Sequence, residues 1–377
     1  MNIVLFFTFG VSLKTWEETG LLDREIQLYK RFVERGLKVT FITFGDEEDY
    51  QFKDRLQDIE IVPYYAYTKK PKTRVLRFLH SFKLPIVLSK TIKEADILKT
   101  NQMWGSWIVM LCKLLYKKKT VVRCGFEKYR SALDNKKESV FHKILLYLIS
   151  WMAYKFCDAI IVTSKEDKEF IIKTFSISEP KVNIFMNYID TNLFKKTDCQ
   201  KYEKKLLFIG RLNEEKNIFS LLDAISQTEY ELDIIGDGDL RPKIEAYIKK
   251  HNIKANLLGR FPNAQLPEII NRYPVFVLPS YYEGNPKVLL EAMACECAVV
   301  GTSVRGIREI IKNNENGLLC ETDADSIKQA ITTLMQDKHL RDKLSRNARQ
   351  FIIENLSLYK TVEKELSLYK NLMNKDA

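Results

Sequence analysis

The sequence has no long apolar run, because nowhere does it reach the roughly 20 apolar residues that a membrane-spanning helix needs. Its apolar start, MNIVLFFTF, has no basic flank and no small-residue cleavage site after it, so we expect a buried strand rather than a signal peptide. The seven cysteines are scattered, odd in number and without a C-x-x-C pair. This pattern favours reduced thiols in a cytoplasmic protein over a disulfide framework.

Metal ligands are also sparse. The four histidines lie far apart in the sequence and form none of the spacings typical of zinc sites. We therefore expect no bound metal and no other resident cofactor. The hydrophobic fraction of 46% and the charged fraction of 29% are those of an ordinary globular protein.

Acidic residues are scarce in one stretch. Residues 51–150 contain 21 Lys or Arg but only 8 Asp or Glu, within a chain of net charge +11. A basic surface attracts anionic lipid, phosphorylated acceptors or nucleic acid, although a well-solvated surface has the same composition. The aromatic–basic interleaving of RNA-binding sheets is missing, so we do not expect nucleic acid as a partner. A negatively charged membrane surface remains a candidate partner, and the segment 141–157 is either an interfacial helix or a buried one.

Short β-branched runs alternate with longer amphipathic segments, the pattern of parallel sheets connected by helices. We expect two Rossmann-like, doubly wound α/β domains facing a cleft, in which ligands bind at the carboxyl ends of the strands. The expected domains are 1–187 and 206–340. A linker, 188–205, joins them, and a helical tail, 341–377, is expected to pack back on the first domain. The expected strands are 3–9, 38–44, 59–65, 96–100, 120–124, 159–164, 205–211, 231–236, 256–260, 275–280, 298–303 and 317–320, and the expected helices include 20–35, 140–156, 216–226, 239–251, 285–295 and 324–336.

The segment SYYEGNPKVLLEAMA, residues 280–294, carries the strongest chemical signal. Asn285 suits a helix cap and Pro286 the first helical position, so we expect a helix to begin there. Glu283 then lies just before the helix and Glu291 inside it, roughly 10 Å apart. The first-turn amides of Lys287 and Val288 lie between these carboxylates. This order suits a nucleotide sugar, because one carboxylate can bind a ribose diol, the amides a diphosphate and the other carboxylate a hexose.

A second signal is LLFIGRLNEEKNIFSLLDAI, residues 206–225. Arg211 follows a predicted strand, and Lys216 stands at the start of an amphipathic helix. Two cations at a strand exit can neutralise a leaving diphosphate, Arg through its planar fork and Lys as a compact charge. The nearby IIGDGDLRPKIE, residues 234–245, lacks the third glycine of a dinucleotide fingerprint, and a tight turn explains it. A dehydrogenase is therefore disfavoured.

These segments together resemble family 4 glycosyltransferases, retaining enzymes of the GT-B fold. The similarity rests on FIGRLNEEKN, IIGDG, LLGRF, VFVLPSYYEGNPKVLLEAMA and GIREIIKNNENGLL, which occur in the family's order and spacing. It is strong over residues 155–325 and weaker before that. The resemblance implies that Arg211 and Lys216 hold the donor phosphates, that Glu291 binds the ribose and that Glu283 binds the transferred sugar. It further places in the donor-binding set Gly284, Asn285, Lys287, Val288, Gly236, the Gly10 loop, Arg260 and Phe261.

The sequence departs from the family in three places. Tyr188 stands where the family usually has glycine, and residues 296–298 read Glu-Cys-Ala where it has Gly-x-Pro. The segment RCGFEKY, residues 123–129, lacks the histidine that many members place in the cleft. Arg123 and Glu127 are therefore candidates for the cleft or the acceptor, without a defined role.

The resulting hypothesis is a metal-independent retaining hexosyltransferase of cell-surface polysaccharide or glycoconjugate synthesis. Its donor would be a UDP- or GDP-sugar and its acceptor a glycan or a polyprenyl-diphosphate-linked sugar. It would be cytoplasmic, or peripheral on the inner face of the cell membrane. The alternatives are a nucleotide-sugar epimerase or another GT-B enzyme that does not transfer, and a binding protein.

Overall fold

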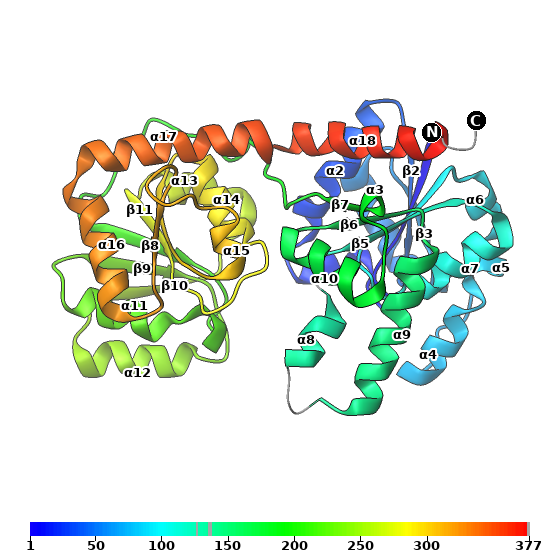
Figure 1. Cartoon of the computed structure of the whole chain (residues 1–377), viewed down its shortest axis with the longest axis horizontal. Helices are drawn as coiled ribbons and strands as arrows, with labels where there is room; N and C mark the ends of the chain where they lie inside the picture. Colours follow the sequence, from blue (N-terminus) through cyan, green and yellow to red (C-terminus); the bar gives the residue numbers. More distant parts are fainter. Residues whose placement is uncertain (126, 135–137, 375–377) are drawn as a thin grey trace. The chain divides into compact units, whose positions relative to one another are not determined.

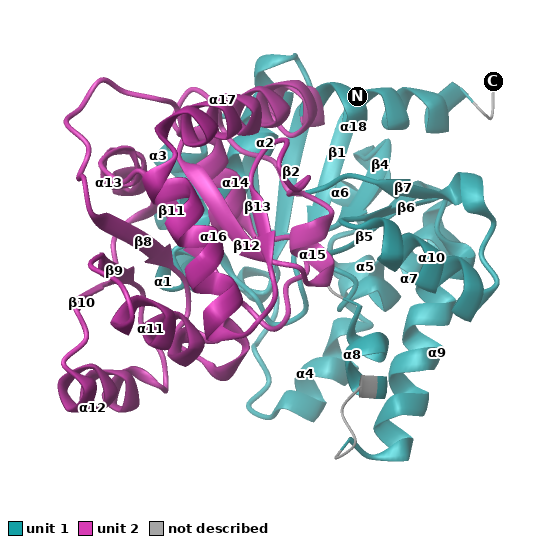
Figure 2. Cartoon of the chain, turned by 60° about the vertical axis from the view of Figure 1, so that its left-hand side comes forward, with its two compact units in different colours: residues 1–186, 362–377 teal, residues 187–361 magenta. Residues whose placement is uncertain are grey.

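The computed structural model describes residues 1–125, 127–134 and 138–374. The chain forms two compact units, shown in Figure 2: unit 1 contains Met1–Met186 and Val362–Ala377, and unit 2 contains Asn187–Thr361. Each unit is built on its own parallel sheet with helical connections. The predicted fold class, two doubly wound parallel-sheet α/β domains, is confirmed.

Unit 1 contains a seven-stranded sheet in the order β3-β2-β1-β4-β5-β6-β7. Its strands are buried on both faces and therefore consist of nearly continuous apolar runs, which is why most were predictable. β7 was not predicted, since it has only three residues. The strands are β1 (Asn2–Phe6), β2 (Lys38–Thr43), β3 (Glu60–Pro63), β4 (Ile97–Thr100), β5 (Lys119–Cys124), β6 (Ala159–Val162) and β7 (Val182–Ile184), and the helices are α1 (Leu13–Glu18), α2 (Leu22–Glu34), α3 (Lys53–Leu56), α4 (Arg74–Ser81), α5 (Leu84–Val87), α6 (Ser89–Glu94), α7 (Ser106–Tyr116), α8 (Lys128–Asp134), α9 (Val140–Phe156) and α10 (Lys165–Phe175).

Unit 2 contains a six-stranded sheet in the order β10-β9-β8-β11-β12-β13. The order changes direction at β8 and β11, so the loops after these two strands flank the topological switch point where such sheets bind ligands. The strands are β8 (Lys205–Ile209), β9 (Glu231–Ile235), β10 (Ala255–Gly259), β11 (Val275–Leu278), β12 (Ala298–Thr302) and β13 (Leu318–Cys320), and the helices are α11 (Ile218–Ser226), α12 (Arg241–His251), α13 (Leu266–Asn271), α14 (Lys287–Ala294), α15 (Arg305–Arg308), α16 (Ala324–Gln336) and α17 (Lys338–Asn355), with short 3-10 helices η4 (Glu214–Lys216) and η5 (Asn263–Gln265).

The unit boundaries differ from the expected domains. The expected linker, 188–205, belongs to unit 2, where Ile189 bridges Ser357 and the Thr197 amide bonds to the Asn271 side chain. The expected tail is divided, because α17 belongs to unit 2 whereas α18 (Leu358–Asn374) lies mostly in unit 1; residues 375–377 lie outside the described residues.

A buried ion pair attaches α18 to the sheet of unit 1. The Lys99 ammonium on β4 lies 2.6 Å from the Glu365 carboxylate on α18, and both side chains are almost fully buried. The Tyr369 hydroxyl donates a second hydrogen bond, of 2.5 Å, to the same carboxylate. Burial lowers the pKa of Lys99, and the nearby Glu365 opposes that shift. Each charge therefore stabilises the other in the protein interior, and removing one would leave the other buried and uncompensated.

Candidate active site

The loop after β8 presents the first group of expected site residues. Arg211 is exposed one residue beyond Gly210, and Lys216 ends the short helix η4. Asn217 follows in the left-handed conformation, with φ of 52°, which Asn tolerates better than most residues. Its side-chain amide donates to the carbonyl of Pro279 (3.0 Å) and to that of Thr322 (2.8 Å). Asn217, which sequence reasoning missed, therefore fixes the position of Lys216 relative to the loop after β11.

Lys216 and Glu283 are in direct contact. The Lys216 ammonium lies 2.5 Å from the Glu283 carboxylate, and the Ser280 hydroxyl donates to the same carboxylate oxygen at 2.7 Å. The two side chains are 17% and 9% exposed. The sequence predicted both residues for the site but not their pairing. A cation and a carboxylate are thus oriented in one place at the exits of β8 and β11.

Gly306, in the short helix α15 that follows β12, also approaches this place. Its amide donates to the Glu283 carbonyl at 3.1 Å, and a Cβ on Gly306 would lie 2.1 Å from the Gly284 carbonyl oxygen. Only glycine permits this approach without a shift of backbone. Gly306 lies inside one of the motifs that carried the resemblance, but sequence reasoning gave it no role.

Helix α14 begins later than expected. Pro286, rather than Asn285, is its N-cap, and Lys287 is the first helical residue. Asn285 instead pairs with Asn187: its side-chain oxygen accepts from the Asn187 amide at 3.2 Å, and its carbonyl accepts from the Asn187 side chain at 2.8 Å. The first helical amides are still those of Lys287 and Val288, in the first turn of α14.

Glu291 lies deeper than Glu283. It is 1% exposed and accepts a hydrogen bond of 3.0 Å from the side-chain amide of Asn263 in η5. Asn263, also missed by sequence reasoning, connects α14 to the loop containing Arg260 and Phe261. The Arg260 side chain is 75% exposed and lies 3.7 Å from the Asp237 carboxylate, and Phe261 is exposed as well.

Close packing against the neighbouring loop explains why residue 236 is a glycine. Its φ is 140°, and a Cβ there would lie 1.8 Å from the Gly210 carbonyl oxygen. The loops after β8 and β9 therefore touch through two glycines, and Arg211 leaves the sheet at this contact.

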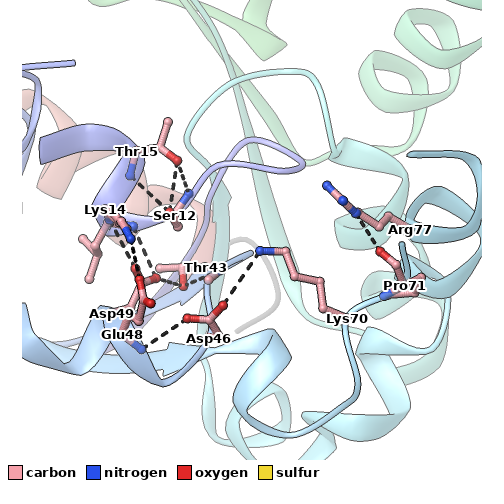
Figure 3. A network of polar contacts seen from close by, with 12 residues as sticks. Ser12, Lys14, Thr15, Thr43, Asp46, Glu48, Asp49, Lys70, Pro71 and Arg77 are labelled. Carbon is pink, nitrogen blue, oxygen red and sulfur yellow. Dashed lines mark hydrogen bonds and ion pairs between the residues drawn. The ribbon is translucent and has the colours of Figure 1, made fainter. Parts of the chain in front are cut away.

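In unit 1, the Gly10 loop follows β1. Gly10 has φ of 83°, and a Cβ on it would meet nothing within 4 Å, so the glycine suits the backbone conformation and leaves the loop open. Figure 3 shows how the chain after it is held: the Asp49 carboxylate accepts from the Leu13 and Lys14 amides and from the Thr43 hydroxyl, while Ser12 caps α1. Burial raises the pKa of the Asp49 carboxyl.

Arg123 and Glu127 do not occupy the open positions expected for an acceptor site. Glu127 is 3% exposed and accepts hydrogen bonds from the Ser150 hydroxyl (3.0 Å) and the Tyr154 hydroxyl on α9. Burial raises the pKa of its carboxyl. Arg123 is partly buried on β5, and its charge acts on Lys99 of β4 and on Tyr369 of α18. Both residues were cleft candidates because their segment stands where many family members place a histidine, but Arg123 lies within β5 and Glu127 packs against α9.

The residues that the structure describes contain no group of three or more His, Cys, Asp or Glu that could hold a metal ion. Within the same residues, no helix is both long enough and apolar enough to cross a bilayer.

Two family models match the chain in succession. The model described as Glycosyltransferase Family 4 matches residues 26–193, and the model described as Glycosyl transferases group 1 matches residues 190–351. Together they cover most of the chain.

Among curated proteins, the chain is 34% identical over 226 residues to the N-acetylgalactosamine-N,N'-diacetylbacillosaminyl-diphospho-undecaprenol 4-alpha-N-acetylgalactosaminyltransferase of Campylobacter jejuni. This match covers 58% of the chain and 60% of the relative. It is also 28% identical over 259 residues to the UDP-Gal:alpha-D-GlcNAc-diphosphoundecaprenol alpha-1,3-galactosyltransferase of Escherichia coli, covering 63% and 67%. The chain therefore spans only about 60% of the length of the first of these relatives.

Solved structures show the same fold. Sucrose-phosphate synthase from Thermosynechococcus elongatus matches over 100% of both chains, with a TM-score of 0.80 and 18% identity. HepE from Anabaena, in complex with UDP, matches over 98% of this chain and 100% of its own, with a TM-score of 0.77 and 16% identity.

Proposed function

The chain belongs to the family 4 glycosyltransferases of the GT-B fold, and from this membership we propose that it transfers a hexose-type sugar from a nucleotide-diphosphate sugar to a glycan or lipid-linked acceptor. Such a reaction would serve cell-surface polysaccharide or glycoconjugate synthesis. The observation that carries the proposal is the contact between Lys216 and Glu283 at the exits of β8 and β11. A cation for a leaving phosphate and a carboxylate for sugar hydroxyls must lie close together, because the bond that breaks joins the sugar to the phosphate.

The donor roles follow from these positions. Arg211 and Lys216 would neutralise the leaving diphosphate, helped by the first-turn amides of Lys287 and Val288. Glu283 would bind the transferred sugar. Glu291, positioned by Asn263, would bind the ribose. UDP or GDP is the proposed nucleotide, and the UDP in the HepE complex supports the former.

We propose transfer with retention, in which the acceptor attacks the same face that the diphosphate leaves and the leaving phosphate takes the acceptor's proton. In this mechanism the protein positions the two substrates and stabilises the developing charge, and no side chain has to act as a base. The burial of Glu127 against α9 supports it, because a carboxylate held there by the Ser150 and Tyr154 hydroxyls is not exposed to act as the base of an inverting reaction. The nucleotide sugar is the substrate, and the proposal includes no resident cofactor or metal.

We expect the transfer to survive chelation and the product to keep the donor's anomeric configuration, since Arg211, Lys216 and helix amides supply the positive charge at the diphosphate. An NMR time course of the first-formed product, recorded in EDTA, measures both properties. An inverted anomer would refute the front-face mechanism, and loss of activity that added divalent ions restore would refute metal independence.

A lipid-linked acceptor is proposed because the Campylobacter and Escherichia relatives are named for undecaprenyl-diphosphate acceptors. Unit 1 also exposes apolar side chains suited to a membrane surface. Helix α9 buries one face and exposes the other, including Phe141 (79%) and Ile144 (53%), while α7 exposes Leu114 (77%). A cavity of about 520 Å³ with mainly apolar walls is lined by residues of α7 and α9. We therefore propose a cytoplasmic protein that docks peripherally on the inner face of the cell membrane.

The protein is expected to co-sediment with anionic phospholipid vesicles at low salt, because apolar side chains and excess basic residues occur on the same unit. Replacing Phe141 and Ile144 together with glutamate should reduce the bound fraction about fivefold or more. Leu258→Glu, at an exposed leucine of unit 2, is the matched control and should bind like the wild type. Failure of the wild-type protein to bind would contradict membrane docking.

A further inference from the structure

Three cations of unit 1 lie near the Gly10 loop and were not singled out from the sequence. Arg74 and Arg77 belong to α4, and Lys128 is the first residue of α8. Both views of the molecule show α4 and α8 at the same end of unit 1 (Figures 1 and 2). The two arginines line a cavity of about 330 Å³ together with Phe9 and Gly10. Two guanidinium groups and an open glycine loop thus border one space.

Arg77 is held in place by backbone oxygens rather than by an acid. Its guanidinium donates to the carbonyl of Pro71 at 2.8 Å and to that of Lys72 at 2.9 Å. Figure 3 shows the contact with Pro71, and it also shows the neighbouring Lys70 reaching the Asp46 carboxylate instead. These bonds fix the orientation of the Arg77 side chain, and no acidic residue in the described part of the chain forms an ion pair with it.

Arg74 and Lys128 are uncompensated as well. Neither makes an ion pair with a residue that the structure describes. Arg74 is the first residue of α4, where the helix dipole disfavours a cation, and no acidic residue stands in that first turn. The Lys128 ammonium lies 4.3 Å from the centre of the Trp104 ring, and the Trp104 carbonyl accepts from the Phe9 amide at the cavity. Burial, and then the charge of Arg74, lowers the pKa of Lys128.

A bound anion would offset the repulsion between these positive charges. The surrounding residues indicate which kind of anion fits. Planar guanidinium groups favour phosphate, and an open glycine allows close approach. The same helix α4 exposes Val75, Leu76 and Leu79, which are 69%, 52% and 58% exposed. A phosphate bound by Arg74 and Arg77 would therefore lie within one helical turn of the exposed apolar side chains of α4. An amphiphile needs both surfaces, one for its phosphate and one for its apolar tail.

We propose that Arg74, Arg77 and Lys128 form a binding site for the diphosphate of a prenyl-linked acceptor. This inference rests on the proposed function, since it specifies how the acceptor is held. The diphosphate of the nucleotide sugar has the same chemistry, but the proposed function already assigns it the cations Arg211 and Lys216 of unit 2.

The test is calorimetric binding of farnesyl diphosphate to the full-length protein saturated with UDP. Arg74→Gln and Arg77→Gln should each weaken this binding about tenfold or more. Arg74→Gln is the safer variant, because Arg77 also holds the turn at Pro71. The matched control is Arg31→Gln, whose side chain is paired with Glu34 on the surface of α2. It should change the affinity less than about twofold. Farnesol, which lacks the phosphates, should bind all variants equally.

UDP affinity, measured separately, distinguishes the two sources of diphosphate. It should stay unchanged in Arg74→Gln and Arg77→Gln. A loss of UDP affinity with unchanged farnesyl diphosphate binding would assign the cations to the donor and overturn the inference. Unchanged binding of both ligands, or no farnesyl diphosphate binding by the wild type, would overturn it as well. If the arginine variants weaken farnesyl diphosphate binding but the protein consumes no nucleotide sugar, the site stands and the proposed function fails.

Discussion

Lys216→Ala is expected to lower kcat/KM for sugar transfer about 30- to 1,000-fold, equivalent to about 2–4 kcal/mol of transition-state stabilisation. The reason is that, in the proposed reaction, the Lys216 charge would be needed most when the diphosphate leaves. The side chain is also positioned for that moment, since Asn217 and the Glu283 carboxylate hold it between two strand exits. Removing it deprives Glu283 of its cationic partner too, so both the phosphate and the sugar contacts should suffer.

The control for this variant is Glu214→Ala, an exposed residue of the same short helix η4. It should keep kcat/KM within about twofold, because a solvent-exposed charge is largely screened. Thermal unfolding of Glu214→Ala should match the wild type, and a cooperative thermal transition of Lys216→Ala should show that this variant is still folded. Wild-type kcat/KM in Lys216→Ala would refute the assignment of this residue to the reaction.

Lys99→Met is expected to destabilise the protein by about 3–5 kcal/mol, because it leaves the Glu365 carboxylate buried without its cation and with the neutral Tyr369 hydroxyl as a partner. Urea unfolding measures the loss, and hydrogen exchange should show it first in α18. The double variant Lys99→Met, Glu365→Leu should recover most of the stability, since no buried charge remains. Lys370→Met, at an exposed lysine of the same helix, should have little effect. If Lys99→Met unfolds like this control, the ion pair does not hold α18.

The fold was predictable because its strands are continuous apolar runs separated by amphipathic helices. What the sequence could not show were pairings between distant residues. Asn285 was expected to cap α14, but it pairs with Asn187, 98 positions earlier. Lys99 and Glu365 are 266 positions apart, and neither was noticed. Both pairs exist only because the folded chain brings separate segments together.

For the same reason, only part of the candidate site could be predicted from the sequence. In the short motifs that follow β8 and β11, local sequence determines where each side chain lies. These motifs contain Arg211, Lys216, Glu283 and Glu291. Asn217 acts through backbone carbonyls of two other loops, which no local pattern indicates. The cations on α4 and α8 come from separate elements of unit 1, so only the structure brings them to one surface. Glu127 differs in the other direction. It was a candidate for the cleft, but its carboxylate is buried against α9.

The proposed reaction moves a sugar from a nucleotide to an acceptor. Mass spectrometry of reactions containing UDP- or GDP-sugars, with and without a prenyl-diphosphate-linked sugar, tests it most directly. We expect the acceptor to gain the mass of one sugar and the consumption of the donor to depend on the acceptor. Conversion of the donor to an isomer at the same rate without any acceptor, and no glycosylated product, would contradict it and favour a non-transferring enzyme of the same fold.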